Sequence, residues 1–351
     1  MSERGFGIVG CGMISEFHAE AIKAIPGARL LAAFDAVPGK AEALAAKHGA
    51  RACRSLGAFL KTPNLEIVTV CTPSGAHAEP AIKAARAGKH LIVEKPLEVT
   101  LRRCDRIIGE CRKAGVRLAT VFPSRFREAA ALVKGAVEAG RFGRLVLGSA
   151  YVKWWRSQAY YDSGAWRGTW KLDGGGALMN QSVHAIDLLQ WLMGPVESVA
   201  ARAGRLAHER IEVEDTAAAA LVFASGALGV IEGSTAAFPG HLQRLELCGS
   251  GGSAVLEGED LRVWQFAEEA PGDAEVRSRF APGRPQAGGQ ADPRAISFVG
   301  HQRQFQDFLG ALSTGAASAV EGPEGRKAVE IILAIYKSAR SGGRPVKLPL
   351  K

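Results

Sequence analysis

A chain of 351 residues with 47% apolar and 23% charged residues is long enough to bury two hydrophobic cores and is ordinary in composition for a globular protein. Its net charge of +9 comes with 44 scattered lysines and arginines that form no basic run, so we expect no nucleic-acid binding, and the positive field favours a small anionic substrate or cofactor. No apolar stretch approaches the roughly eighteen residues of a membrane helix, and the first strand begins too early to leave room for a signal peptide, so we expect a cytoplasmic protein with no membrane partner.

The six cysteines form no CxxC pair and no metal-ligand cluster. Several fall in segments that are expected to be strands or helices. This pattern predicts the reduced, buried thiols of a cytosolic protein, and no metal site.

The chain begins with a strand, a glycine-rich loop and a helix. Residues 6–9 predict a buried strand, and residues 10–15, GCGMIS, match a GxGxxG loop in which serine replaces the third glycine. A helix follows to about residue 25, and a second apolar strand at 29–34 ends in Asp35. In such a unit, backbone N–H groups at the helix start bind a dinucleotide pyrophosphate, and the acidic residue accepts bonds from ribose hydroxyls. The predicted cofactor residues here are Gly10, Gly12, Met13, Ile14 and Asp35.

Asp35 also bears on the identity of the dinucleotide. Its carboxylate repels a 2′-phosphate, and residues 36–38, Ala-Val-Pro, offer no arginine that could bind one. We therefore expect NAD rather than NADP. A tight turn between strand and helix that binds no ligand is the structural alternative.

Strands and helices keep alternating up to residue 122. The segments 66–71, 90–93 and 116–122 predict strands, and 40–48, 56–61, 77–87 and 101–114 predict helices. This alternation is typical of a parallel sheet, in which ligands bind at the carboxyl ends of the strands. The residues at such ends, which we expect to crowd one crevice, are Gly12, Thr72, Pro73, Glu94 and Lys95.

The pattern changes in the rest of the chain. A helix is expected at 125–139, and period-two alternation then predicts strands at 145–152, 196–206, 213–224, 226–236, 242–248, 252–256 and 261–266. Neighbouring strands with short turns form an antiparallel sheet, and apolar patches on its faces favour a homo-oligomer. Residues 267–297 predict a mobile surface loop because they are rich in Glu, Asp, Gly, Pro and Arg, and helices at 301–312 and 324–338 complete the chain.

Aromatic residues and arginines concentrate between residues 154 and 170, which contain four of the six tryptophans. Aromatic faces pack against sugar rings, and arginine forks bind carboxylate or phosphate, so this segment suits a polyhydroxylated anionic substrate. The predicted substrate residues are Arg156, Tyr160, Trp166 and Arg167. A buried hydrophobic corner with surface arginines is the alternative.

Three glycines at 174–176 precede helix-forming and apolar residues, which predicts a flexible turn and then a buried helix from about residue 177. At roughly 100° per residue, Asn180, His184 and Asp187 fall within about 60° of one another on this helix. An unpartnered buried polar group costs about 1–3 kcal/mol, so these side chains either satisfy each other, with His184 bonded to Asp187, or line a wet cavity. His301 is a further candidate for a cleft, although a histidine at a helix start is usually a cap or a surface group.

These motifs, in this order, resemble the glucose–fructose oxidoreductase, inositol dehydrogenase and MocA family over essentially the whole chain. The resemblance is carried by the loop 10–15, CTPSGAH at 71–77, AGKH at 87–90, EKPL at 94–97, and glycines 174–176 with His184 and Asp187. It implies an α/β fold: an N-terminal Rossmann dinucleotide-binding domain over 1–123, and an α+β domain over 124–351 with a large open-faced, mostly antiparallel sheet. The second domain would bind the substrate and join a homo-dimer or homo-tetramer through its sheet.

The resemblance also implies an NAD-dependent dehydrogenase or reductase that acts on CH–OH groups. The lysine matching Lys95 contacts the reacting hydroxyl in such enzymes, and the histidine matching His184 acts as acid and base. If that hydroxyl is about as weak an acid as water, with a pKa of about 15.7, its ionisation at pH 7 costs about 12 kcal/mol, so a base must share the load. The remaining cofactor motifs contribute Thr72, Pro73, His77, Glu94 and Lys95.

Asn180 stands where many members of the family carry an aspartate. With the arginine-rich aromatic segment, this departure resembles the branch that acts on nucleotide-linked sugars, such as the 3-dehydrogenases of UDP-N-acetylglucosaminuronate. An amide can fix the histidine or hydrogen-bond the substrate, but it cannot stabilise an imidazolium by charge. The alternatives are the same scaffold acting on an inositol, a free sugar or a dihydrodiol, and a nicotinamide-binding protein without turnover.

Overall fold

The computed structural model describes residues 3–280 and 297–350, which belong to two compact units. The first unit contains Met1–Pro123, Lys171–Gly174 and Ser297–Val329, and the second contains Ser124–Trp170, Gly175–Ile296 and Glu330–Lys351. The chain therefore returns to the N-terminal unit after residue 297.

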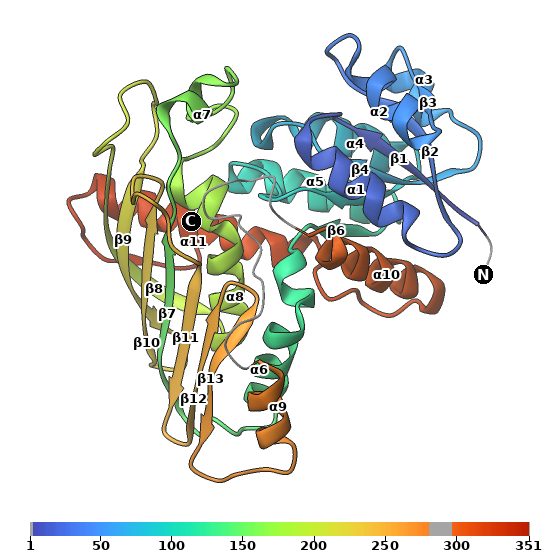
Figure 1. The fold of residues 1–351 in the computed structure, drawn as a ribbon. Coiled ribbons are helices and arrows are strands. Elements are labelled where there is room, and N and C mark those ends of the chain that lie inside the picture. The colour runs from blue at the N-terminus through green and yellow to red at the C-terminus, as the bar shows by residue number, and fades with distance from the viewer. Residues whose placement is uncertain (1–2, 281–296, 351) are drawn as a thin grey trace. The chain divides into compact units, whose positions relative to one another are not determined.

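The first unit is built on a six-stranded sheet in the order β3-β2-β1-β4-β5-β6 (Figure 1). The strands are β1 Arg4–Val9, β2 Ala28–Phe34, β3 Arg51–Ala52, β4 Leu65–Val70, β5 His90–Val93 and β6 Leu118–Thr120. All of their pairings are parallel, as the alternation of strands and helices predicts. The strand order reverses between β1 and β4, the position at which such sheets bind their ligands.

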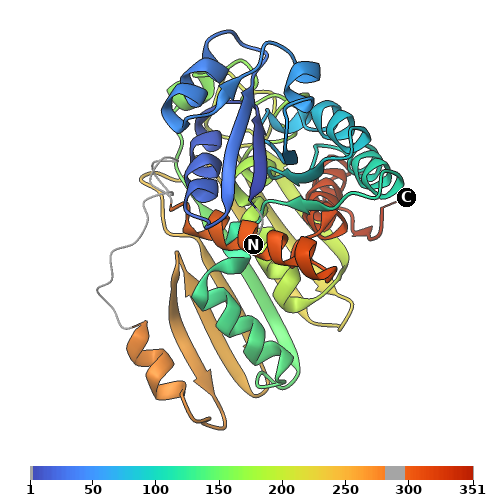
Figure 2. The same cartoon turned by 90° about the vertical axis from the view of Figure 1, so that its right-hand side faces the viewer.

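Helices cover both faces of this sheet (Figure 2), which explains why its central strands are apolar along almost their whole length. The helices are α1 Met13–Lys23, α2 Lys40–His48, α3 Leu56–Leu60, η1 Ser74–Ala76, α4 Ala78–Arg86, α5 Leu101–Lys113 and α10 Val299–Thr314. Helix α10 packs against α1, and the ring of Phe305 stacks 6.2 Å from that of Phe6 on β1. The segment after residue 297 thus adds aromatic residues to the N-terminal core.

The second unit is built on an eight-stranded sheet in the order β13-β12-β11-β7-β10-β9-β8-β14. The strands are β7 Leu145–Lys153, β8 Val196–Gly204, β9 Thr216–Phe223, β10 Leu228–Ser234, β11 Arg244–Gly249, β12 Gly252–Glu257, β13 Asp260–Phe266 and β14 Val346–Lys347. Among the described strands of this second sheet, only β7 and β10 pair in parallel, so the expectation of a mostly antiparallel sheet is confirmed. Helices α6 Glu128–Glu138 and α8 Val183–Met193 lie against one face of this sheet (Figure 1).

Two segments of the second unit differ from expectation. Strand β9 begins at Thr216 rather than at residue 213, because the carboxylates of Glu214 and Asp215 bind backbone N–H groups of other segments. Within the predicted loop 267–297, Asp273–Arg279 form helix α9, and Asp273 accepts the N–H of Ala270 at 2.7 Å. Residues 281–296 of that loop lie outside the described residues.

The remaining elements are η2 Pro123–Phe126, α7 Gln158–Asp162, η3 Ala177–Ser182 and α11 Gly322–Arg340, which belongs to the first unit at its start and to the second from Glu330 onward. All six cysteine thiols are free; four are buried, whereas Cys11 and Cys248 are partly exposed, so the expectation of buried thiols holds for four. Across residues 3–280 and 297–350, we find no helix with both the length and the apolar character that a membrane span requires.

Candidate active site

Three loops follow the neighbouring strands β1, β4 and β5 and are packed directly on one another. Gly10 has a φ of +89°, and a Cβ atom there would lie 2.5 Å from the backbone nitrogen of Thr72, so only glycine fits. The buried ring of His77 lies between two carbonyl oxygens, with Nε2 at 2.9 Å from that of Thr72 and Nδ1 at 2.9 Å from that of Pro96. The ring therefore ties the loop after β4 to the loop after β5, and burial lowers its pKa.

The start of helix α1 has the properties of an anion site. Gly12 precedes the helix, and a Cβ atom at Gly12 would have no atom of the described residues within 4 Å. No side chain in the described part of the chain caps this helix start, so the N–H groups of Met13 and Ile14 keep the unsatisfied character of a first turn. A pyrophosphate can approach the backbone closely at this position.

Asp35 is fixed at the end of β2 beside the glycine loop. Its Oδ2 accepts the N–H of Cys11 at 2.7 Å, and its Oδ1 accepts the N–H of Val37 at 2.7 Å. Each carboxylate oxygen has a further acceptor site, so the side chain can still accept bonds from ribose hydroxyls.

Glu94 lies in a buried cluster that the sequence does not indicate. His18 Nε2 lies 2.9 Å and His301 Nε2 3.8 Å from Glu94 Oε1, while Oε2 accepts the N–H of Lys95 at 2.9 Å. Burial alone would raise the pKa of Glu94, but His18 and His301 hold this pKa well below its usual range. The ligand atoms of these three side chains lie within 4.8 Å of one another, close enough for a metal ion, yet both oxygens of Glu94 already have protein partners.

Lys95 differs from its neighbours in solvent access. Every other residue from 91 to 99 is buried, whereas Lys95 is partly exposed. Its backbone is thus fixed through Glu94 while its side chain keeps access to solvent.

In the second unit, Asn180 and His184 are likewise more exposed to solvent than the residues around them. Residues 177–182 form a π-helix, η3, which continues into α8, and such turns are frequent at functional sites. From residue 177 to residue 190, all side chains are buried except those of Asn180 and His184. Both predicted residues therefore border accessible space.

Asp187, by contrast, is only 1% exposed. Its two carboxylate oxygens accept bonds from Nε and Nη2 of Arg125 at 2.8 and 2.6 Å. This buried ion pair with Arg125 balances the charge of the Asp187 carboxylate. Arg125 was missed because it lies 62 residues earlier and no local pattern connects the two.

Gly175 and Gly176, before η3, lie where a larger residue would not fit. A Cβ atom at Gly175 would lie 2.0 Å from the hydroxyl of Tyr336, and one at Gly176 would lie 1.9 Å from the carbonyl oxygen of Glu214. The carboxylate of Glu214 accepts the N–H groups of Gly176 and Leu178 at 3.0 and 2.9 Å and the hydroxyl of Tyr336 at 2.9 Å. Burial raises the pKa of Glu214 to about 7.

Three of the predicted substrate residues meet Asn180 through one side chain, that of Gln181. Arg156 Nη2 donates to Gln181 Oε1 at 3.0 Å, and Gln181 Nε2 donates to the oxygens of Asn180 and Tyr160 at 2.9 and 3.1 Å. Arg167 Nη1 donates to the same Tyr160 hydroxyl at 2.7 Å. Gln181 was not predicted, because its partners Arg156 and Tyr160 lie in a different segment of the chain.

Aromatic rings flank the two arginines of this network. The guanidinium of Arg167 lies 4.3 Å from the ring centroid of Tyr160 and 4.5 Å from that of Trp166. Arg156 is 3% exposed, so it is not the surface arginine of the hydrophobic-corner alternative. Trp166 contacts Arg167 but takes no part in the hydrogen bonds around Gln181 that are described above.

Comparisons with known proteins identify a known family domain in each half of the chain. Residues 4–122 match the oxidoreductase family with an NAD-binding Rossmann fold, and residues 130–255 match the GFO/IDH/MocA C-terminal domain. The myo-inositol 2-dehydrogenase of Thermotoga maritima is 31% identical over 353 residues, which cover 97% of this chain and 98% of the relative.

Solved structures resemble the whole chain. The WlbA dehydrogenase of Bordetella pertussis, in complex with NADH and UDP-GlcNAcA, is 37% identical with a TM-score of 0.90, and the match covers 100% of this chain and 99% of that one. The WlbA dehydrogenase of Chromobacterium violaceum, in complex with the same two molecules, is 34% identical with a TM-score of 0.86 and covers 100% and 97%.

Proposed function

The chain belongs to the GFO/IDH/MocA family of NAD-dependent oxidoreductases, and from this premise we propose that its substrate is an anionic sugar nucleotide. Enzymes of this kind transfer a hydride between nicotinamide and a secondary alcohol or ketone of a sugar or sugar nucleotide, and this chain is one of them. The proposal goes further in naming the charge and the nucleotide.

The observation that carries the proposal is the network around Gln181. Arg156 and Arg167 bring two guanidinium groups next to Tyr160, and Asn180 is joined to them through Gln181. Arginine binds carboxylate and phosphate with two parallel bonds, and aromatic faces pack on sugar rings. The resemblance to WlbA dehydrogenases, whose structures hold UDP-GlcNAcA, supports the same substrate class.

In this proposal the cofactor is NAD, bound by the first unit. The N–H groups of Met13 and Ile14 bind the pyrophosphate, Gly12 allows its close approach, and Asp35 accepts the ribose hydroxyls, while Gly10 lets this loop pack on Thr72. Thr72, Pro73 and Lys95 line the nicotinamide half. His77 and Glu94 act through other residues: His77 holds the loops after β4 and β5 together, and Glu94 fixes the Lys95 backbone.

Lys95 and His184 carry the proton chemistry. His184 accepts the hydroxyl proton as the hydride leaves carbon, and the Lys95 ammonium stabilises the negative charge that develops on oxygen. Asn180 orients the histidine or hydrogen-bonds the substrate. In the reverse direction, the same groups protonate a ketone.

The second candidate substrate is an inositol, which is favoured by the T. maritima relative. A panel of UDP-GlcNAcA, UDP-GlcNAc and myo-inositol with NAD, followed by NADH absorbance, separates the two. We expect the highest kcat/KM for UDP-GlcNAcA. Turnover of myo-inositol without turnover of either UDP-sugar would overturn the proposed substrate.

The proposed assembly is a dimer or tetramer formed through the sheet of the second unit. Leu147 on β7 and Leu228 on β10 are 41% and 56% exposed, and the two residues pair across the two strands on one face of the sheet. Adjacent exposed apolar residues in a sheet favour burial against a second copy. Light scattering of the wild type and of Leu228→Lys tests this assembly: the wild type should have at least twice the monomer mass, and the variant should dissociate.

A further inference from the structure

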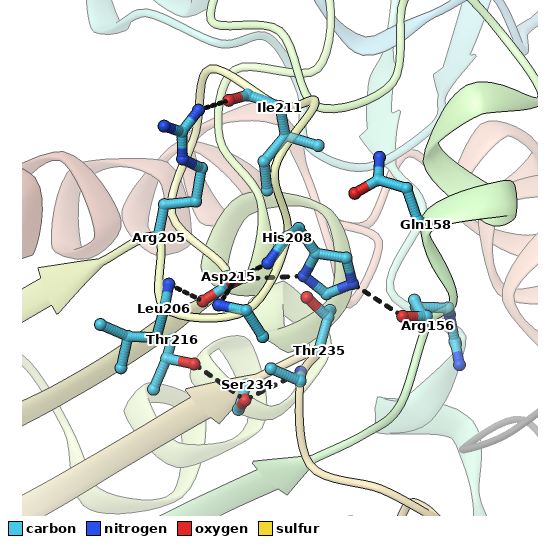
Figure 3. A network of polar contacts seen from close by, with 12 residues as sticks. Arg156, Gln158, Arg205, Leu206, His208, Ile211, Asp215, Thr216, Ser234 and Thr235 are labelled. Atoms are coloured by element: carbon cyan, nitrogen blue, oxygen red, sulfur yellow. Dashed lines mark hydrogen bonds and ion pairs between the residues drawn. The ribbon is translucent and has the colours of Figure 1, made fainter.

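Two consecutive buried carboxylates, Glu214 and Asp215, stand directly before β9. They are 5% and 0% exposed, and their side chains serve different segments. Glu214 binds the N–H groups at the start of η3, as described above. Asp215 accepts the N–H groups of Leu206, Ala207 and His208, all at 2.9 Å, in the loop that joins β8 to β9 (Figure 3).

The ring of His208 connects Asp215 to the backbone of Arg156. Its Nδ1 lies 3.0 Å from Asp215 Oδ2, and its Nε2 lies 2.8 Å from the carbonyl oxygen of Arg156 (Figure 3). Both neighbours are acceptors, so both bonds form only when both ring nitrogens carry a proton. The hydrogen bond with Asp215 raises the pKa of His208 and favours this imidazolium form.

Arg156 depends on this cluster for its backbone position. Strand β7 ends at Lys153, so Arg156 lies beyond the sheet ladder. Its N–H donates to the carbonyl oxygen of Thr235 at 2.8 Å, and the N–H of Thr235 donates to the carbonyl oxygen of Asp215 at 2.9 Å. The backbone of Arg156 is therefore held on one side through Thr235 and on the other through His208, and both connections lead to Asp215.

We propose that Glu214 and Asp215 are a pair of positioning residues that set both parts of the substrate site in the second unit. Asp215, acting through His208, fixes Arg156, and Glu214 fixes the first turn of the helix that carries Asn180 and His184. Because the two carboxylates are neighbours in the chain, a single dipeptide fixes the position of Arg156 relative to the helix that carries Asn180 and His184. The assignment rests on the proposed function of Arg156 and His184.

Deprotonation of His208 removes one of the two hydrogen bonds that its ring donates, to Asp215 and to the carbonyl of Arg156. A neutral ring donates to Asp215 or to Arg156 but not to both. Among residues 3–280 and 297–350, the groups in contact with the ring are the Asp215 carboxylate, the Arg156 carbonyl and the edge-on ring of Tyr161, whose centroid lies 4.8 Å away, so no second cation contacts it there. Arg156 should lose its fixed position as pH rises through the pKa of His208, and substrate affinity should fall with it.

Steady-state kinetics from pH 6 to pH 9 test the pair with the variants His208→Gln, Asp215→Asn and Glu214→Gln. We expect His208→Gln and Asp215→Asn to raise KM for the sugar nucleotide about tenfold with little change in kcat, and to abolish the rise of KM with pH seen in the wild type. Glu214→Gln should instead lower kcat about tenfold with little change in KM. The Kd for NAD should stay constant in all three, because the first unit binds NAD.

The matched control is Asp273→Asn. Asp273 is also a buried carboxylate, with bonds to Arg141, Trp264 Nε1 and the N–H of Ala270, but it lies in α9 among residues with no proposed role in the site. If the three variants alter KM and kcat no more than Asp273→Asn does at an equal loss of melting temperature, Glu214 and Asp215 are only structural and the pair is refuted.

Amide hydrogen exchange separates failure of the pair from failure of the proposed substrate, since it needs no substrate. Exchange at Arg156 should accelerate at least tenfold in Asp215→Asn and His208→Gln, and exchange at Gly176 and Leu178 should accelerate in Glu214→Gln. Unchanged exchange refutes the pair even if the wild type turns over a sugar nucleotide. Accelerated exchange in the variants, together with a wild type that turns over no UDP-sugar, upholds the pair and refutes the substrate.

Discussion

The imidazole of His18 lies 2.9 Å from the carboxylate of Glu94, and neither residue is more than 4% exposed. The same carboxylate accepts the backbone N–H of Lys95, so a buried anion fixes the residue to which we assign stabilisation of the developing negative charge. The interior of the first unit and the proposed chemistry are thus joined through Glu94.

Replacing Glu94 by Gln should remove that anion while keeping its shape. We expect a loss of about 2 kcal/mol in the free energy of unfolding at pH 7, because His18 and the Lys95 N–H lose a charged acceptor. The low pKa of Glu94 means that its contribution is present at neutral pH and is lost as pH falls below the usual carboxyl range, so wild type and variant should converge in acid. Urea unfolding at pH 7 and at pH values well below 4.5 measures this difference, with the partly exposed Glu16→Gln as a control that should cost well under about 1 kcal/mol.

The two glycines of the first loop should respond differently to alanine. Gly12→Ala adds a methyl group where the described residues leave space, and its φ of −87° suits any residue, so the variant should fold normally but bind NAD at least about tenfold more weakly. Gly10→Ala places a methyl group 2.5 Å from the backbone of Thr72 at a φ of +89°, so it should destabilise the protein itself. Fluorescence titration with NADH and thermal unfolding distinguish the two effects. Gly109→Ala, on α5 with open space around it, is the control: NADH affinity should be unchanged, and stability should not fall because alanine is the better helix former.

The first unit could be predicted from the sequence because its signals are local. Apolar runs, glycine turns and the acid at residue 35 are read within one βαβ unit, and the observed strands and helices follow them closely. The return of α10 to this unit could not be predicted, since an amphipathic helix does not indicate which of two cores will bury it.

The second unit shows where such reasoning fails. The residues Glu214 and Asp215 continue an alternating pattern and were predicted as part of a strand, but their side chains bind partners up to 122 residues away. The π-helix at 177–182 has the composition of an α-helix, so no sequence signal distinguishes it. Arg156, Tyr160 and Arg167 were predicted because arginine and aromatic side chains suit a polyhydroxylated anionic substrate, and Asn180 because it shares a helix face with His184. Gln181, which joins them, has no distinctive chemistry.

Cofactor choice should depend on Asp35. We expect the wild type to prefer NAD over NADP strongly, because the carboxylate repels a 2′-phosphate. Asp35→Ser should weaken NAD and remove most of the discrimination, since two N–H donors, of Cys11 and Val37, lose a charged acceptor and the repulsion disappears. Comparison of kcat/KM for the two cofactors measures the effect, and equal use of both by the wild type would contradict the assignment.

Lys95→Ala and His184→Ala should each lower kcat at least about 100-fold, since general acid–base groups and charge stabilisation at the reacting oxygen contribute on this scale. NAD should still bind to both variants, as NADH fluorescence can show. Lys83→Ala and His241→Ala are matched controls at exposed positions outside the proposed site and should retain wild-type kcat. Near-normal turnover in either active-site variant would remove that residue from the mechanism.

The stability of the second unit should fall as pH rises towards neutrality, because of Glu214. Burial raises its pKa to about 7 from an ordinary value of 4.5, so folding favours the protonated form. The stabilising contribution is therefore complete below about pH 4.5 and is lost as pH rises through about 7, a change of about 3 kcal/mol. Urea unfolding between pH 4 and pH 8 should show this decline in the wild type and a flatter profile in Glu214→Gln. Asp273→Asn tests the sign independently: the pKa of Asp273 is held well below its usual range by Arg141, so this variant should lose stability relative to the wild type at neutral pH and converge with it in acid. A Glu214→Gln profile that still falls between pH 4.5 and pH 7 would assign the titration to another group.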